Sequence, residues 1–139
     1  MKTPSQIAEE IAMIGPRIGR KILADLSQVA DIPPAQMFVL IFLSHNGPMR
    51  TSDIVHELKV AAPTATGIVD RLQASGYAVR SEDKEDRRAV IVELTADGKK
   101  IANKLRSAAV AQWTDILSKI SRDDAEKYLE ILKKINEAL

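Results

Sequence analysis

The residues best suited to do chemistry lie in a polar run between residues 81 and 88. Asp86 and Arg88 are two positions apart, and at that spacing in a strand two side chains share one face. The carboxylate can then hold the guanidinium in a fixed pose through charge-assisted hydrogen bonds. An arginine held in this way can enter a narrow DNA minor groove, where the potential is most negative. The alternative is a plain solvated hairpin, the usual meaning of a charged run.

A second polar group lies on a helix predicted just before that run. Apolar residues recur there at spacings of three and four, which predicts one buried face made of Ala65, Ile68, Val69 and Leu72. The outward positions hold Thr64, Thr66, Gly67, Asp70 and Arg71. Hydroxyls can reach phosphates or base edges, and a glycine allows close backbone approach. Few of these side chains read bases specifically, so we expect modest selectivity; the alternative is a merely solvated face.

The elements that position these residues follow from the surrounding pattern. Gly76 stands where a helix C-terminus needs a residue that tolerates a positive φ. Two strands are predicted by period-two alternation in Tyr77, Val79, Val90, Val92 and Leu94. The charged run between the strands is too polar to be buried and must project into solvent. A helix followed by a two-stranded ribbon with a charged tip is the winged form of the helix-turn-helix.

Four pieces of this region stand in a specific order and spacing: VDRL at Val69–Leu72, Gly76, EDRRAV at Glu85–Val90 and LTADG at Leu94–Gly98. Together they resemble the MarR family of winged helix-turn-helix transcriptional regulators, and the resemblance extends over the whole chain. It implies that Arg88 enters a minor groove. It also implies that the acidic Asp70 pairs with a wing arginine, for which we predict Arg88.

The predicted DNA-binding residues are spread over two helices and the wing: Thr51, Pro63, Thr64, Thr66, Gly67, Arg71, Lys84, Arg87 and Arg88. Among them, Arg87 and Lys84 are predicted phosphate contacts. Asp70 and Asp86 are predicted to position the wing. One departure from the family pattern is Ala61-Ala62, which occupies the place where Ser, Asp or Asn usually caps the recognition helix.

Composition bounds these interpretations. The chain has 139 residues, 45% hydrophobic and 28% charged, which is consistent with one domain. Its net charge is +1, and between residues 48 and 94 acids outnumber bases by one, so composition alone would not indicate a nucleic-acid binder. The absence of cysteine excludes disulfides, Cys-based zinc sites and thiol redox sensing. The two histidines lack metal-ligand spacing, so we expect neither a metal nor a cofactor.

Long helices are predicted at both ends of the chain. An apolar stripe predicts a first helix of about seven turns, through Ile7, Ile11, Ile14, Ile18, Ile22, Leu26 and Val29. Gly15-Pro16 should kink or briefly break this helix. The stripe could pack on the chain's own C-terminal helices or form a dimer interface; we favour the dimer, because a small domain has little core to cover so long a helix.

The C-terminal half should contribute two more helices to that interface. Thr95 is predicted to cap a helix whose apolar residues are Ile101, Leu105, Ala109, Trp113, Ile116 and Ile120. Ser121 to Asp124 forms a capping box for a last helix. We expect the inward residues of this helix to be Ala125, Tyr128, Leu129, Leu132 and Ile135.

The middle of the chain should supply the hub and the first helix of the helix-turn-helix. Asp31 before Ile32-Pro33-Pro34 is a helix-start signal, and the nearly all-apolar stretch from Gln36 to Ser44 should be buried on most sides. Thr51 can cap the next short helix. We therefore expect one MarR-type domain over residues 1–139. Residues 1–30 and 95–139 would be dimerisation helices, and residues 31–94 the winged helix-turn-helix.

These observations predict a mainly α protein with a small β-ribbon wing that regulates transcription by binding double-stranded DNA. We expect a homodimeric repressor on a pseudo-palindromic operator. The resemblance also implies a small anionic or aromatic effector. No catalytic motif is present, so an enzyme is not expected. No leader or membrane-spanning run is seen, which predicts a cytoplasmic protein. The alternative function is a winged-helix protein-interaction module that does not bind DNA.

Overall fold

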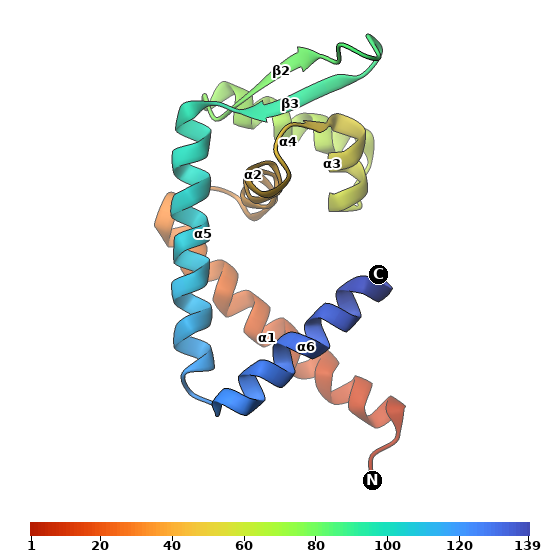
Figure 1. The fold of residues 1–139 in the computed structure, drawn as a ribbon, viewed down its shortest axis with the longest axis vertical. Coiled ribbons are helices and arrows are strands. Elements are labelled where there is room, and N and C mark those ends of the chain that lie inside the picture. The colour runs from red at the N-terminus through yellow and green to blue at the C-terminus, as the bar shows by residue number, and fades with distance from the viewer.

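The computed structural model describes residues 1–139 as six helices and a three-stranded antiparallel sheet (Figure 1). The helices are α1 (Pro4–Ala30), α2 (Pro34–Asn46), α3 (Thr51–Leu58), α4 (Ala62–Ala74), α5 (Ala96–Leu117) and α6 (Arg122–Ala138). The strands are β1 (Met49–Arg50), β2 (Ala78–Glu82) and β3 (Val90–Leu94). The sheet and α2 to α4 form one end of the molecule, and α1, α5 and α6 extend from it (Figure 1). The predicted mainly helical winged fold is confirmed.

Helix α2 is the hub of the core, as the apolar run predicted. Met37, Val39, Leu40 and Leu43 are at most 2% exposed. The helix contacts α3, α4, α5 and β3, so the reading elements and the long helix share one core. Gly47 ends α2 at φ +76°, the left-handed region that favours glycine.

The corner between α1 and α2 differs from the prediction. Asp31 does not start α2; its φ of 48° ends α1, and its N–H donates to Ser27 O at 3.0 Å. Helix α2 begins at Pro34 instead, where a missing N–H costs no hydrogen bond. The two helices meet at a bend of 81°. No single helix is both long and apolar enough to cross a membrane; only this bent pair together reaches that length and composition.

Helix α1 runs unbroken through Gly15-Pro16, so the predicted break is wrong. Proline removes one backbone donor, and this part of the helix is exposed, where water can satisfy the freed carbonyl. The helix is capped by Thr3, whose side chain accepts from the Gln6 N–H at 3.3 Å in a capping box. Only its C-terminal part, around Leu26, reaches the core.

Helix α6 begins at Ser121 as predicted, with the Asp124 N–H donating to the Ser121 hydroxyl at 3.1 Å. The predicted inward packing of its apolar face is wrong within the single chain. None of its residues is buried, and Leu129, Leu132 and Ile135 are 40% to 52% exposed. The helix turns back from the far end of α5 (Figure 1). Its apolar side therefore needs a partner that this chain does not supply.

The sheet has the order β1-β3-β2, so the ribbon predicted from two strands has a third. Strand β1 has two residues, too few to show a period, and pairs with β3 through Met49↔Val92 and Arg50↔Ile91. Val92 is fully buried, whereas Val79 and Val90 are both 40% exposed. On β2 the side facing the core carries the buried Ala78 and the half-buried Arg80.

A tight joint connects the wing to α5. The Thr95 hydroxyl donates to Gly76 O at 2.6 Å and accepts from the Gly98 N–H at 3.0 Å, so this residue caps α5 as predicted. The Thr95 N–H also donates to Tyr77 O at 3.1 Å. Gly98 lies so close to this turn that a Cβ there would be 1.9 Å from Tyr77 O. Only glycine fits this position without movement of the backbone.

Candidate nucleic-acid interface

Helix α4 presents the polar face that the sequence predicted. Its apolar residues Ala65, Ile68, Val69 and Leu72 are at most 4% exposed, which holds the opposite face outward. Thr64, Thr66, Asp70 and Arg71 are exposed and Gly67 is half-buried. The helix starts at Ala61, which makes no side-chain cap, and Pro63 lies in its first turn. The uncapped start predicted from Ala61-Ala62 is thus confirmed.

Arg80 on β2, rather than Arg88, is the partner of Asp70. Its guanidinium lies 2.6 Å from Asp70 Oδ1 and donates to Thr66 O at 3.2 Å and to Gln73 Oε1 at 3.1 Å. The partner is a wing arginine, as the resemblance implied, but the choice of Arg88 is wrong: Arg80 lies on β2 in contact with α4, whereas Arg88 lies on the wing loop. Arg80 therefore ties the recognition helix to the wing through all three contacts.

Asp86 and Arg88 do contact each other, but in a turn and not in a strand. Asp86 Oδ1 accepts from the Arg88 N–H at 3.0 Å and from Arg88 Nε at 3.3 Å. Strand β3 begins only at Val90, so the two side chains meet because the aspartate caps its own turn, a common use of this residue. The Arg88 side chain is 93% exposed. The result is a fully accessible guanidinium attached at one edge.

Asp83 organises the other side of the wing loop, and the sequence analysis missed it. Its carboxylate lies 2.6 Å from the Arg50 guanidinium and accepts from the Glu85 N–H at 3.0 Å. Its own N–H donates to Ala89 O at 3.2 Å, which closes the loop. These contacts fasten the wing to the start of α3. The sequence shows only that Arg50 and Asp83 are both present, and nothing in it indicates that they lie close together.

The Glu85 N–H hydrogen bond lowers the pKa of Asp83 below its ordinary value of 3.8; burial opposes this, and Arg50 adds to the lowering. A depressed pKa means that ionised Asp83 stabilises the folded loop above the unfolded-state pKa. This contribution is lost as the pH falls through the lower folded-state value. We expect a carboxyl ¹³C NMR titration to give an Asp83 midpoint below 3.8. In Arg50→Gln the midpoint should rise; an unchanged midpoint would rule out the ion pair as a cause.

The start of α3 also departs from the prediction. Arg50, not Thr51, occupies the N-cap position, and its N–H donates to Asp53 Oδ2 at 3.2 Å. Thr51 is the first helical residue, and its hydroxyl reaches Val90 O at 3.5 Å. Because β1 ends at Arg50, the helix begins directly at Thr51, and this threonine therefore lies in the first turn of α3 and not at its N-cap.

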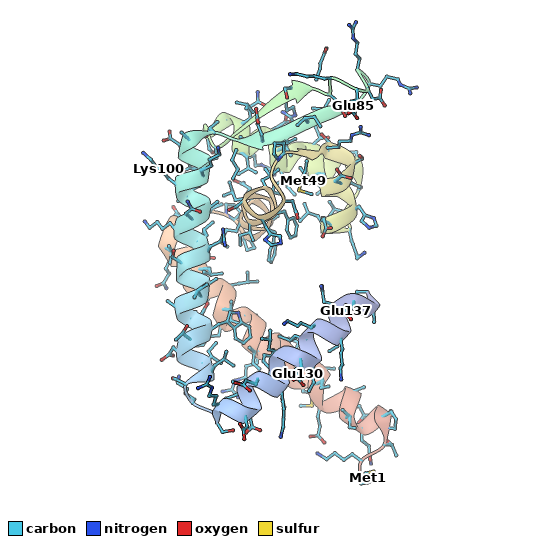
Figure 2. All side chains as sticks on the ribbon, in the orientation of Figure 1. Met1, Met49, Glu85, Lys100, Glu130 and Glu137 are labelled. Atoms are coloured by element: carbon cyan, nitrogen blue, oxygen red, sulfur yellow. The ribbon has the colours of Figure 1, made fainter.

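A groove of about 620 Å³ lies between α3, α4 and the wing. Its polar lining residues are Arg50, Thr51, Ser52, Thr66, Arg80, Asp86 and Arg88. Of the other predicted site residues, Lys84 and Arg87 are exposed on the wing loop without an ion pair. Figure 2 shows Glu85 at this tip, with neighbouring side chains projecting into solvent. Arg71 lies away from the groove, beside the α1–α2 corner with Asp31 and Pro33.

The groove explains how a nearly neutral module can present cations. Each of its three arginines, Arg50, Arg80 and Arg88, has its own aspartate, respectively Asp83, Asp70 and Asp86. Exposed ion pairs add little stability, so the main effect of these aspartates is to fix guanidinium positions. Arg50 and Arg88 keep free N–H donors, which suit their fixed guanidinium groups to phosphates and minor grooves.

A separate apolar groove of about 490 Å³ lies between α1, α5 and α6. Its lining includes Ile14, Ile18, Trp113, Ile116 and Tyr128. The rings of Trp113 and Tyr128 are 6.0 Å apart. No group of three or more His, Cys, Asp or Glu side chains here or elsewhere in residues 1–139 is arranged to hold a metal ion.

Comparison with known proteins gives consistent results. Residues 32–90 match the model of the MarR family. The uncharacterised HTH-type transcriptional regulator YfiV of Bacillus subtilis is 34% identical over 119 residues, which cover 84% of this chain and 74% of that protein. The HTH-type transcriptional repressor MdtR of the same organism is 24% identical, over 99% of this chain and 91% of its own. The structure of a MarR family protein from Bacillus stearothermophilus has a TM-score of 0.82 at 18% identity, covering 99% of this chain and 98% of that one.

Proposed function

The chain belongs to the MarR family of HTH transcriptional regulators, DNA-binding proteins and not enzymes, and from this we propose that it is a homodimeric repressor of a pseudo-palindromic operator. The observation that carries the DNA contacts is the groove with its aspartate-held arginines beside the exposed threonines of α4. The residues we assign to DNA are Thr51, Pro63, Thr64, Thr66, Gly67, Lys84, Arg87 and Arg88; the predicted Arg71 is left out, because it lies beside the α1–α2 corner and not in the groove.

Exposed apolar surface on α1 and α6 supports the homodimer. Ile7, Ile11, Ile14 and Ile18 are 43% to 63% exposed on one side of α1. A contiguous apolar surface of this kind on a protein of this size typically marks an association site. Two copies joined there would place two α4 helices in successive major grooves, about one helical turn of DNA apart.

The repressor assignment and the effector are proposed on separate grounds. The relative MdtR is named a repressor, which favours repression here. The family resemblance implies that an effector would lie between α1, α2 and the start of α5. On α2, Phe38 is 41% exposed and its ring stacks on the half-buried Phe42, with the ring centroids 6.4 Å apart. The exposed ring of Phe38 suits contact with a small aromatic ligand. A shift of the melting temperature by aromatic acids would test this part alone.

The wing provides the test of DNA recognition. Arg88→Ala should cost roughly 1–3 kcal/mol per wing and reduce the preference for A·T-rich flanks, because it removes the minor-groove cation. Arg87→Ala should weaken binding evenly across sequences and flatten the salt slope by about one per contact. Asp86→Ala should resemble a milder Arg88 loss, since it frees the guanidinium without removing its charge. Binding would be measured by fluorescence anisotropy on a duplex selected from genomic fragments.

All three variants should fold, because each side chain lies on the wing loop, and circular dichroism checks this. If Arg88→Ala binds the selected duplex as tightly as the wild type, the wing does not read DNA. In that case a protein-interaction module would be the better description of the winged region.

A further inference from the structure

Arg50 holds a fixed position at the rim of the groove. It is the last residue of β1, pairs with Ile91 of β3, and caps α3. Its backbone is therefore attached to the sheet and to the helix-turn-helix at once. Because its backbone is fixed in this way, Arg50 keeps its side chain in a constant position relative to the sheet and to α3. A contact that sets the register of the protein on DNA requires such a fixed position.

The Arg50 side chain has N–H donors that no protein atom accepts. One terminal nitrogen contacts Asp83, and the side chain remains 42% exposed on the groove. A guanidinium carries five N–H donors, so most of them have no protein acceptor here. Arg80 is the instructive contrast, because Asp70, Thr66 O and Gln73 occupy its terminal nitrogens and only 26% of its side chain is exposed.

The carboxylate of Asp83 is turned away from solvent and held by the loop. Its side chain is only 13% exposed and also accepts from the Glu85 N–H. The positive partner of the pair thus faces the groove, while the negative one is covered. Arg88 lines the same groove from the wing, and the hydroxyls of Ser52 and Thr66 lie along it.

We propose that Arg50 is a further DNA-contacting residue, which binds a backbone phosphate between α3 and the wing, and that Asp83 positions it. This assignment rests on the proposed DNA-binding function and adds a contact that sequence patterning did not suggest. A phosphate in the groove would accept hydrogen bonds from Arg50 and from a neighbouring hydroxyl. The contact carries no base information, so it strengthens binding to every sequence alike.

The salt dependence of binding separates a phosphate contact from a structural role. Arg50→Gln in the full chain should weaken binding roughly tenfold on the selected duplex and on an unrelated one. The slope of log K against log salt should become shallower by about two for a dimer, since each lost phosphate contact removes about 0.9. Arg50→Lys should keep the wild-type slope, because it retains the charge. Asp83→Asn should weaken binding but leave a slope at least as steep as the wild type.

Arg122 on α6 gives the matched control, since it is an exposed arginine paired with Glu126 at 3.2 Å and remote from the wing. Arg122→Gln should not change the slope. If Arg50 only fastened the wing, Arg50→Gln and Asp83→Asn would lose affinity equally at the wild-type slope, and the inference would be overturned. A wild-type chain that selects no duplex would overturn the proposed function as well, whereas an unchanged Arg50→Gln slope removes this inference alone.

Discussion

Ile18→Asp is expected to convert the proposed dimer into monomers that keep a folded winged module. Ile18 is 43% exposed in the single chain and lines the apolar groove of α1, α5 and α6, so its burial depends on the partner. Burying an unpaired carboxylate costs several kcal/mol. A twofold interface contains two copies, so the dissociation constant should rise by roughly three orders of magnitude or more.

Sedimentation equilibrium at micromolar concentration measures this effect. The wild type should have a mass of about 31 kDa, twice that of the 15.3 kDa chain, and Ile18→Asp should approach the single-chain mass. Met13→Asp is the matched control, because Met13 is 80% exposed and lies roughly 140° around α1 from Ile18, away from the isoleucine stripe. A monomeric wild type with full helicity would refute the proposed dimer.

Gly98→Ala should both destabilise the protein and weaken its DNA binding. The added Cβ would meet Tyr77 O at 1.9 Å and Tyr77 C at 2.9 Å, and these backbone atoms cannot rotate aside as a side chain can. Overpacking of this kind costs about 1–3 kcal/mol. Opening the joint also strains the hydrogen bonds of Thr95 to Gly76 O and Tyr77 O, each worth about 1 kcal/mol. We expect a total loss of about 3 kcal/mol in urea denaturation.

The DNA effect follows from geometry. This joint sets the angle between α5, which carries the proposed dimer interface, and the turn that ends α4. A changed angle would alter the spacing of the two α4 helices, so binding should fall even where Gly98→Ala is fully folded. Gly67→Ala is the stability control, because a Cβ there meets nothing within 4 Å. Equal stability of Gly98→Ala and the wild type would show that the joint relaxes freely.

Local patterns in the sequence determined most of the secondary structure. The buried face of α4 repeats at spacings of three and four, and the caps at Thr95 and Ser121 act within three residues, so both are visible along the chain. The contact of Asp86 with Arg88 was also predictable, since the two residues are only two positions apart. Even there the reason was a turn and not a strand, because the start of β3 depends on its pairing partners.

Contacts between distant segments were decided only by the tertiary structure. Asp70 pairs with Arg80 because β2 packs against α4, and no pattern within either segment shows how a helix and a strand pack on each other. Arg50 meets Asp83 because a two-residue strand, too short to show a period, adds to the sheet edge. Amphipathic spacing showed that α1 and α6 have apolar faces, but not what covers them. Burial depends on which atoms surround a side chain, and within one chain most apolar residues on these faces of α1 and α6 remain exposed.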